Sequence, residues 1–564
     1  MMWYTIYNKK CGKERVWMKN IPIGVEDFKE LIDRGYYYVD KSMFMKDVLK
    51  EKVVLYTIPR RFGKTLNMSM LNYFYNIKEK ENAYLFNDLA ISKDTDVMQH
   101  QNKYPVISIT LKEMKQSNFQ EQANDFKEII STVIGNYSEL LTSQMLNQIE
   151  KEKLYKYYEG EVNEAQLGRS LLFISQCLEK HYKEKVVILI DEYDVPLQHA
   201  YLQGYYDEMV GFIRNVFSAA LKTNSSLQQG ILTGCLRIAK ESIFTGMNNF
   251  SVYGITEEIS ASYFGFTPNE VQEILSYYDL LAYENEVKNW YNGYLFGKQE
   301  MYNPWSIIHY VKKAIRTTDK SPISFWANTS GNDIVMRYIQ QGDRQMKKEF
   351  DTLVNKGSIV KKIMPELTYR EMDNIDNIYS FLLFTGYLKI GKEIDRSEDM
   401  YELKIPNEEV RKVYMNQFEV AFKEYTNARK DMLMQYLHEG KEKEVNNILN
   451  DILERSISYY DNKESFYHGL LLGLLSEYEV ISNEEAGTGR LDIAIRPRNI
   501  RDNVVIIECK HAKDEDDLMD ACAEAIQQIE EKGYMKKKAY QMYGGVIGYG
   551  ISFYKKRCYV VKSE

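Results

Sequence analysis

Short apolar runs alternate with helical stretches through the first half of the chain. Four runs have the residue types of buried β-strands: Val53–Thr57, Pro105–Leu111, Val186–Ile190 and Gly230–Gly234. Strands separated by helical segments indicate a mainly parallel sheet with covering helices. Between the second and third runs, the polar and helical stretch Met114–Lys185 predicts an insertion or a helical layer.

The pattern changes twice further along. From about Glu257 to about Asn462 it predicts helices joined by aromatic-rich connections, which we interpret as a helical lid followed by a linking helical region. Next, a helix at Ser465–Tyr478 precedes two β runs, a helix at Asp516–Lys532 and two more β runs that end near Val561. This order predicts a compact α/β unit.

Length and composition set the class of protein. A chain of 564 residues exceeds the size at which one core stops growing, so two to four domains are expected. No apolar run approaches the roughly 20 residues of a membrane span, and Met1–Asn20 lacks the apolar core of a signal peptide. The six cysteines form no CxxC pair, which argues against a disulfide framework and a zinc site. We therefore predict a cytoplasmic protein without a membrane partner.

The charge distribution limits any nucleic-acid surface to local patches. The formal net charge is −8, so the chain as a whole does not attract nucleic acid. Basic residues gather near the C-terminus: Arg490, Arg496, Arg498, Arg501, Lys536–Lys538 and Lys555–Arg557. Each run is either part of a nucleic-acid surface or a solvated charged face.

A candidate phosphate site follows the first strand. Ile58-Pro-Arg-Arg-Phe-Gly-Lys-Thr65 comes directly after it, and a helical segment begins at Leu66. In a P-loop, backbone N–H groups of such a turn point at phosphate oxygens, the Lys reaches the terminal phosphates and the Ser/Thr hydroxyl binds Mg²⁺. The first glycine of GxxxxGK[ST] is replaced by Ile58, so the loop entry must be formed differently. A surface turn is the alternative. The predicted nucleotide-binding residues are Pro59, Arg60, Arg61, Phe62, Gly63, Lys64 and Thr65.

The third strand supplies the second half of this site. It ends in Asp191-Glu192, as a Walker B segment does. We expect Asp191, with Thr65, to hold Mg²⁺ and Glu192 to orient or deprotonate the attacking water. An isolated acidic pair at a strand end is otherwise often only solvated.

The fourth strand and nearby cations supply further candidates. Thr233 stands where a side chain could sense the γ-phosphate or its water. Candidate charge stabilisers for phosphoryl transfer are Arg60, Arg61, Arg237 and Lys240, each of which could equally be a surface cation.

Several motifs together resemble the AAA-ATPase-like family of bacteria and archaea. They are Ile21-Pro-Ile-Gly-Val, Tyr38-Val-Asp-Lys41, Pro59–Thr65, Leu189-Ile-Asp-Glu-Tyr-Asp194, Leu232-Thr-Gly234 with Arg237-Ile-Ala-Lys-Glu-Ser242, and Tyr302-Asn-Pro-Trp305. The resemblance implies an AAA+ fold, ATP as ligand and, commonly in that family, a C-terminal PD-(D/E)XK nuclease domain. Family members start near the Ile-Pro-Ile-Gly stretch, so residues 1–17 are expected to be an extension without a role in the fold.

The C-terminal unit carries its own candidate chemistry. In the strand Val504–Lys510, Glu508 and Lys510 are two residues apart and share a face, and Asp492 can meet them from the neighbouring strand. Two carboxylates that hold a metal and a lysine that orients water suit Mg²⁺-assisted phosphodiester hydrolysis. This is the spacing of PD-(D/E)XK nucleases. A structural salt bridge between Glu508 and Lys510 is the alternative.

The predicted fold class is therefore α/β. We expect a P-loop AAA+ type parallel sheet with a helical lid and linker, followed by a PD-(D/E)XK restriction-endonuclease-like domain. The expected boundaries are 18–256 for the ATPase-like domain, 257–462 for the lid and linking region, and 463–564 for the nuclease-like domain.

Two functional hypotheses follow. In the first, ATP binding or hydrolysis controls a metal-dependent nuclease that acts on DNA. In the second, the P-loop domain is a regulatory nucleotide switch, and the C-terminal domain only binds nucleic acid or protein. The first predicts divalent-dependent nicking of DNA that depends on Asp492 and Lys510. AAA modules often assemble, so a homo-oligomer is a further possibility for either hypothesis.

Overall fold

The computed structural model describes residues 18–563, apart from 238–249, 327–343, 368, 374, 456–463, 476–477, 487–488 and 498. The expected extension at 1–17 and the candidate cations Lys240 and Arg498 therefore lie outside the described residues. The chain divides into two compact units, Met1–Val413 and Tyr414–Glu564.

A five-stranded parallel sheet forms the centre of the first unit. Its strand order is β2-β3-β4-β1-β5, with bounds Val106–Thr110, Val186–Asp191, Leu227–Gly234, Val53–Thr57 and Phe250–Gly254. The four expected strands are present, and the parallel sheet is confirmed. All residues of β1 and β3 are buried, as expected for central strands covered on both faces. The edge strand β5 was not predicted, because its residues are mostly half-exposed and form no apolar run.

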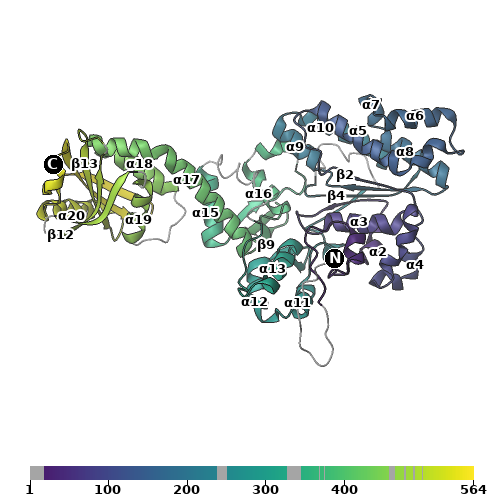
Figure 1. The fold of residues 1–564 in the computed structure, drawn as a ribbon, viewed down its shortest axis with the longest axis horizontal. Coiled ribbons are helices and arrows are strands. Elements are labelled where there is room, and N and C mark those ends of the chain that lie inside the picture. Colours follow the sequence, from purple (N-terminus) through teal and green to yellow (C-terminus); the bar gives the residue numbers. More distant parts are fainter. Residues whose placement is uncertain are drawn as a thin grey trace, which may run out of the picture. The chain divides into compact units, whose positions relative to one another are not determined.

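Helices cover both faces of this sheet (Figure 1). Helix α3, Lys64–Tyr75, lies on one side with α1, Phe28–Asp33, α2, Phe44–Val48, and α4, Thr95–Met98. The other side carries the predicted helical layer with α5, Phe119–Asn136, α6, Gln148–Tyr158, α7, Glu164–Leu167, α8, Ser170–Tyr182, α9, Val195–Gln203, and α10, Tyr206–Phe217. Helix α5 illustrates why this layer forms helices that pack on the sheet. Its buried positions recur at helical spacing: Phe126, Ile130, Val133 and Ile134.

The rest of the first unit combines helices with short strands. The segment that we interpret from the sequence as a lid contains α11, Pro268–Tyr277, α12, Glu284–Tyr291, α13, Pro304–Arg316, and the hairpin of β6, Tyr294–Phe296, with β7, Gln299–Met301. Beyond it lie α15, Arg344–Lys356, α16, Ile375–Phe384, and the sheet β8-β10-β9 with bounds Ile359–Lys362, Met400–Lys404 and Lys389–Asp395. The sequence pattern predicted only helices here. These strands are missed because they are short or largely exposed, so they lack the apolar alternation of a half-buried sheet.

The second unit is an α/β sandwich around a mixed sheet. The strand order is β11-β12-β13-β14-β15, with bounds Glu479–Ala486, Gly489–Arg496, Asn503–His511, Gly545–Tyr554 and Arg557–Lys562. Only the β13–β14 pair is parallel. The helices are α18, Glu442–Arg455, α19, Glu464–Leu475, α20, Leu518–Glu531, and the end of α17, Glu408–Glu439.

Strand β13 shows how this sheet separates two cores. Val505, Ile507 and Cys509 pack in one hydrophobic cluster with residues of α18 and α19. Val504 and Ile506 pack in another cluster with Ile529 of α20. Because side chains alternate along a strand, Glu508 and Lys510 belong to the α20 face. The predicted shared face of these two residues is therefore present.

Two expectations from composition concern this fold. Within the described ranges, no helix has the length and apolar character needed to cross a membrane. The five cysteines of the described part of the chain are all buried free thiols: Cys177, Cys235, Cys509, Cys522 and Cys558.

Candidate functional sites

The predicted P-loop is a turn between β1 and α3. Gly63 forms the N-cap of α3 with a φ of 85°, in the left-handed region that glycine adopts without strain. Arg61 also has a positive φ of 70°. The entry that lacks a glycine is formed by Ile58, which is 2% exposed and donates its N–H to the Gly234 carbonyl at 2.9 Å. The neighbouring strand β4 thus holds the start of the loop.

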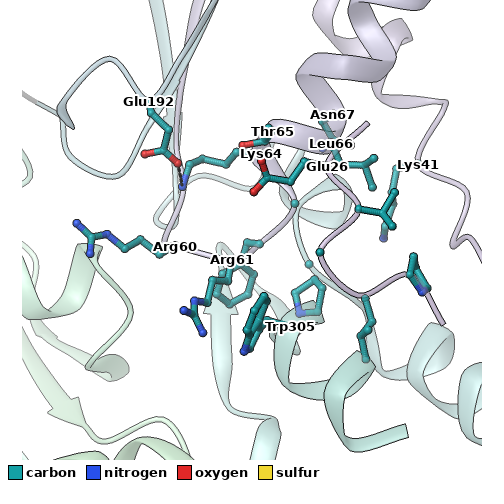
Figure 2. A pocket seen from close by; sticks show the side chains of 18 of the residues that line it. Glu26, Lys41, Arg60, Arg61, Lys64, Thr65, Leu66, Asn67, Glu192 and Trp305 are labelled. Atoms are coloured by element: carbon teal, nitrogen blue, oxygen red, sulfur yellow. Dashed lines mark ion pairs between the residues drawn. The ribbon is translucent and has the colours of Figure 1, made fainter. Parts of the chain in front are cut away.

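Lys64 lies inside this turn. Its ammonium group donates to the carbonyl oxygens of Ile58 at 3.0 Å and Pro59 at 3.2 Å, and it forms an ion pair with Glu192 at 3.6 Å. Figure 2 shows the two side chains facing each other. Burial opposes the charge, but Cys235, Glu192 and other acidic groups hold the pKa of Lys64 above its ordinary value. The lysine is therefore a cation at the N-terminus of α3.

Asp191, at the end of β3, is bonded both to the first turn of α3 and to the end of β4. The Thr65 hydroxyl donates to Asp191 Oδ2 at 2.8 Å, and the Thr233 hydroxyl donates to Oδ1. Burial and the charge of Glu192 raise the pKa of Asp191. Thr65 and Asp191 thus place a hydroxyl and a carboxylate together, a donor set that suits Mg²⁺. Thr233 contacts Asp191 directly.

Tyr193 and Asp194, which directly follow Glu192, fix the chain at the end of β4. The Tyr193 hydroxyl donates to the Leu236 carbonyl at 2.5 Å. Asp194 Oδ2 accepts from the N–H groups of Cys235 at 2.9 Å and Leu236 at 3.1 Å. Burial and the nearby Glu192 raise the pKa of Asp194. These bonds hold the segment that follows Thr233 against the Asp191 loop.

A pocket of about 620 Å³ adjoins the turn. The predicted residues that line it are Arg60, Arg61, Phe62, Gly63, Lys64, Thr65 and Glu192. Asp191 and Thr233 lie behind this wall, and Pro59 contributes its carbonyl to Lys64. Apolar lining residues come from the N-terminal segment and from residues 265–308, including Ile21, Pro22, Val39, Phe266, Trp305 and Ile308. A pocket that combines apolar side chains with several charged ones suits a nucleotide.

The lid also holds the P-loop from outside. The Gly265 N–H donates to the Phe62 carbonyl at 3.0 Å, and the buried Phe62 ring packs against Tyr294 and Phe296 with ring centres 5.0 Å apart in both cases. Asn303 caps α13 by accepting from the Trp305 N–H at 2.9 Å. The loop conformation therefore depends on the lid as well as on its own glycine.

The remaining candidate cations fall into different places. Arg60 donates to Gln198 Oε1 at 3.0 Å at the edge of the pocket. Arg237 pairs with Glu366 at 3.0 Å and does not line the pocket.

The predicted carboxylates of the second unit come together on the β12–β13 hairpin. The Asp492 N–H donates to Glu508 Oε2 at 3.4 Å, and Asp492 Oδ2 accepts from the Cys509 N–H at 2.9 Å. Lys510 lies 3.6 Å from Glu508. All three predicted residues therefore occupy one site.

Gln528 of α20 completes this cluster. Its Oε1 accepts from the Lys510 ammonium at 2.7 Å, and its Nε2 donates to Glu508 Oε1. Burial, followed by the charge of Asp492, raises the pKa of Glu508 to about 7. A nearby divalent cation would favour the charged carboxylate. Asp492 and Glu508 are acceptable Mg²⁺ ligands, because Mg²⁺ is commonly held by one or two carboxylates and keeps several waters. Within the described residues, no group of three or more His, Cys, Asp or Glu side chains could hold a metal.

Comparisons with known proteins match two families to the two regions of the chain that contain these candidate sites. Residues 22–244 match the family described as "Predicted AAA-ATPase", and residues 462–563 match the PD-(D/E)XK nuclease superfamily. The resemblance expected from the motifs and the α/β fold class is thereby confirmed. A relative described as "Uncharacterized protein in vnfD 5'region", from Azotobacter chroococcum mcd 1, is 24% identical over 399 residues, which cover 70% of this chain and 68% of the relative.

Several residues at these sites were not assigned from the sequence. Trp305 belongs to the motif Tyr302–Trp305, and Gln528 belongs to the predicted helix Asp516–Lys532. Neither residue had a predicted role of its own. A polar side chain about three turns into α20, on the face toward Glu508, was a usable signal for Gln528. No local pattern pairs Trp305 with the P-loop, because their contact is made by the tertiary fold.

Proposed function

We propose that the first unit binds ATP with Mg²⁺ and hydrolyses it, and that the second unit is a metal-dependent nuclease that acts on DNA. The arrangement of Thr65, Asp191 and Thr233 beside Lys64 and Glu192 is the observation that carries the ATP site. It brings a helix N-terminus, a cation, a magnesium-type donor pair and a carboxylate base to one end of a parallel sheet. The family matches support both assignments.

In this proposal each residue of the ATP site has one task. Lys64 leaves the loop carbonyls and donates to the β- and γ-phosphates, while backbone N–H groups at Gly63 and Lys64 hold phosphate oxygens. Thr65 and Asp191 would hold Mg²⁺, which would neutralise phosphate charge when bound. Glu192, released from Lys64, accepts a proton from the water that attacks the γ-phosphate.

The nuclease assignment rests on Asp492, Glu508 and Lys510. The carboxylates would hold Mg²⁺, which would polarise the scissile phosphate and its bound water. Lys510 would orient the attacking water or stabilise the charge of the phosphorane, and Gln528 would keep Lys510 and Glu508 in place.

Nicking of supercoiled DNA by the purified protein with Mg²⁺ or Mn²⁺ tests this assignment. We expect cleavage that is lost with EDTA and lost in Asp492→Ala and Lys510→Ala. Lys513→Ala, which removes an exposed lysine shortly after the same strand, is the matched control and should cleave normally. Absence of metal-dependent nicking by the folded wild-type protein would favour the regulatory switch with a C-terminal binding module.

A further inference from the structure

Arg61 differs from Lys41, Arg60 and Lys64, three other cations that line the candidate nucleotide pocket. Its guanidinium carbon lies 4.3 Å from the centre of the Trp305 ring, and both residues line the pocket (Figure 2). The nitrogen Nη1 is buried and has no hydrogen-bond partner within the described part of the chain. A guanidinium carries five N–H donors. A buried N–H donor without an acceptor is unfavourable.

The neighbouring cations are compensated. Lys64 has two loop carbonyls and Glu192, and Arg60 has Gln198. Lys41, which also lines the pocket, pairs with Glu270 at 2.6 Å. Burial lowers the pKa of Arg61 to about 10, although Tyr387 and Glu409 favour the charge from a distance. Arg61 is therefore a cation of this pocket whose charge could be met by a bound anion.

The surface on which Arg61 lies is also incompletely bonded. Trp305 Nε1 and His309 Nε2 are buried without a partner among the described residues. The Trp305 and His309 rings lie against each other with centres 4.2 Å apart and planes tilted by 39°. A cation over an indole ring is a weaker arrangement than a guanidinium bonded to phosphate. The cation–π contact with Trp305 therefore holds Arg61 only weakly.

We propose that Arg61 senses the terminal phosphate of the bound nucleotide: its guanidinium leaves the Trp305 ring and donates to that phosphate. This inference rests on the proposed ATP site. The P-loop thereby supplies its own arginine, and the lid residue Trp305 changes its surroundings when the triphosphate binds. The next residue, Ser306, donates to Glu409 in the first turn of α17 at 2.6 Å.

Affinity for two nucleotides gives the first test. Calorimetry of Arg61→Gln with ATP and with ADP, each with Mg²⁺, should show at least an approximately tenfold loss of ATP affinity and little change for ADP. Arg61→Lys should retain part of the ATP affinity. Lys313→Gln is the matched control, because Lys313 is a cation of α13 that pairs with Asp319. Unchanged ATP affinity in Arg61→Gln, or an equal loss for both nucleotides, would overturn the inference.

Tryptophan fluorescence gives a second test that does not depend on the stability of the Arg61 variant. The Trp305 signal is the difference between the wild type and Trp305→Phe, each measured without nucleotide, with ADP and with a non-hydrolysable ATP analogue. We expect ATP analogue, and not ADP, to change it. An unchanged signal at saturating analogue would overturn the inference. The proposed ATP site itself fails only if Lys64→Ala binds ATP as the wild type does, so the two failures are distinguishable.

Discussion

The two sites of this chain are assembled in opposite ways. The candidate nucleotide site takes Lys64 from the start of α3, directly after β1, and Asp191 and Thr233 from β3 and β4, and the order β3-β4-β1 brings them together. The candidate metal site takes Asp492, Glu508 and Lys510 from one hairpin. A local site can be read from strand alternation alone, whereas a dispersed site also requires the sheet order and the lid.

The difference extends to charge. At the nucleotide site, cations line a pocket and the central carboxylate is occupied by two hydroxyl donors. At the metal site, two carboxylates lie close together and one has a pKa raised to about 7. The first arrangement suits an anionic ligand and the second suits a cation. Substitutions at each site can therefore test this contrast.

Glu192→Gln should stop ATP turnover while ATP binding is kept. The amide cannot accept the proton of the attacking water, and loss of a general base lowers a rate by about 10²–10⁴-fold. Steady-state phosphate release and calorimetry on the same preparation measure the two quantities. Turnover close to the wild-type rate would show that Glu192 only pairs with Lys64.

Lys64→Ala should weaken ATP binding by at least about 100-fold, because the ammonium supplies the main point charge on the terminal phosphates. Lys46→Ala is the control, since Lys46 is an exposed lysine that pairs with Asp94. Equal ATP affinity in both variants would remove the P-loop assignment.

Gln528→Ala should lower the affinity of the second site for Mn²⁺ by about 10–100-fold, the usual effect of losing a residue that orients a metal ligand. Gln527→Ala is a close control, because the adjacent side chain is exposed and bonds Glu531 instead. Binding by both variants at the wild-type level would mean that Gln528 plays no part in holding Glu508.

Glu409 predicts a pH dependence of stability in the first unit. Burial raises its pKa to about 6 from 4.5, while Ser306 and the N–H groups of Phe325 and Trp326 stabilise the charged form. The folded protein therefore binds the proton more tightly than the unfolded chain. The contribution is present below pH 4.5 and is lost as pH rises through about 6, a change of about 2 kcal/mol.

Denaturant unfolding from pH 4.5 to 7 measures this slope. Glu409→Gln should flatten it, and Glu408→Gln should not, because Glu408 is partly exposed and pairs with Arg411. The same slope in Glu409→Gln and the wild type would contradict the assignment.

The features that could be predicted from the sequence are those that depend on local structure. The strand–turn–helix unit at Lys64 and the shared face of Glu508 and Lys510 follow from hydrophobic patterns and strand alternation. The 4.3 Å contact between the Arg61 guanidinium and the Trp305 ring could not be predicted. The two residues are more than 240 positions apart, so their contact depends on how the lid folds onto the loop. The β8-β10-β9 sheet was missed because its strands are largely exposed and carry no apolar alternation.

One chain is proposed to hold two separate metal-dependent sites. The number of ions bound can be measured by calorimetric titration of Mn²⁺ into the protein saturated with a non-hydrolysable ATP analogue. We predict two bound ions for the wild type, one for Lys64→Ala, one for Glu508→Gln and none for the double variant. If Glu508→Gln binds as many ions as the wild type, Asp492, Glu508 and Lys510 form an ordinary salt-bridge cluster, and the nuclease assignment is contradicted.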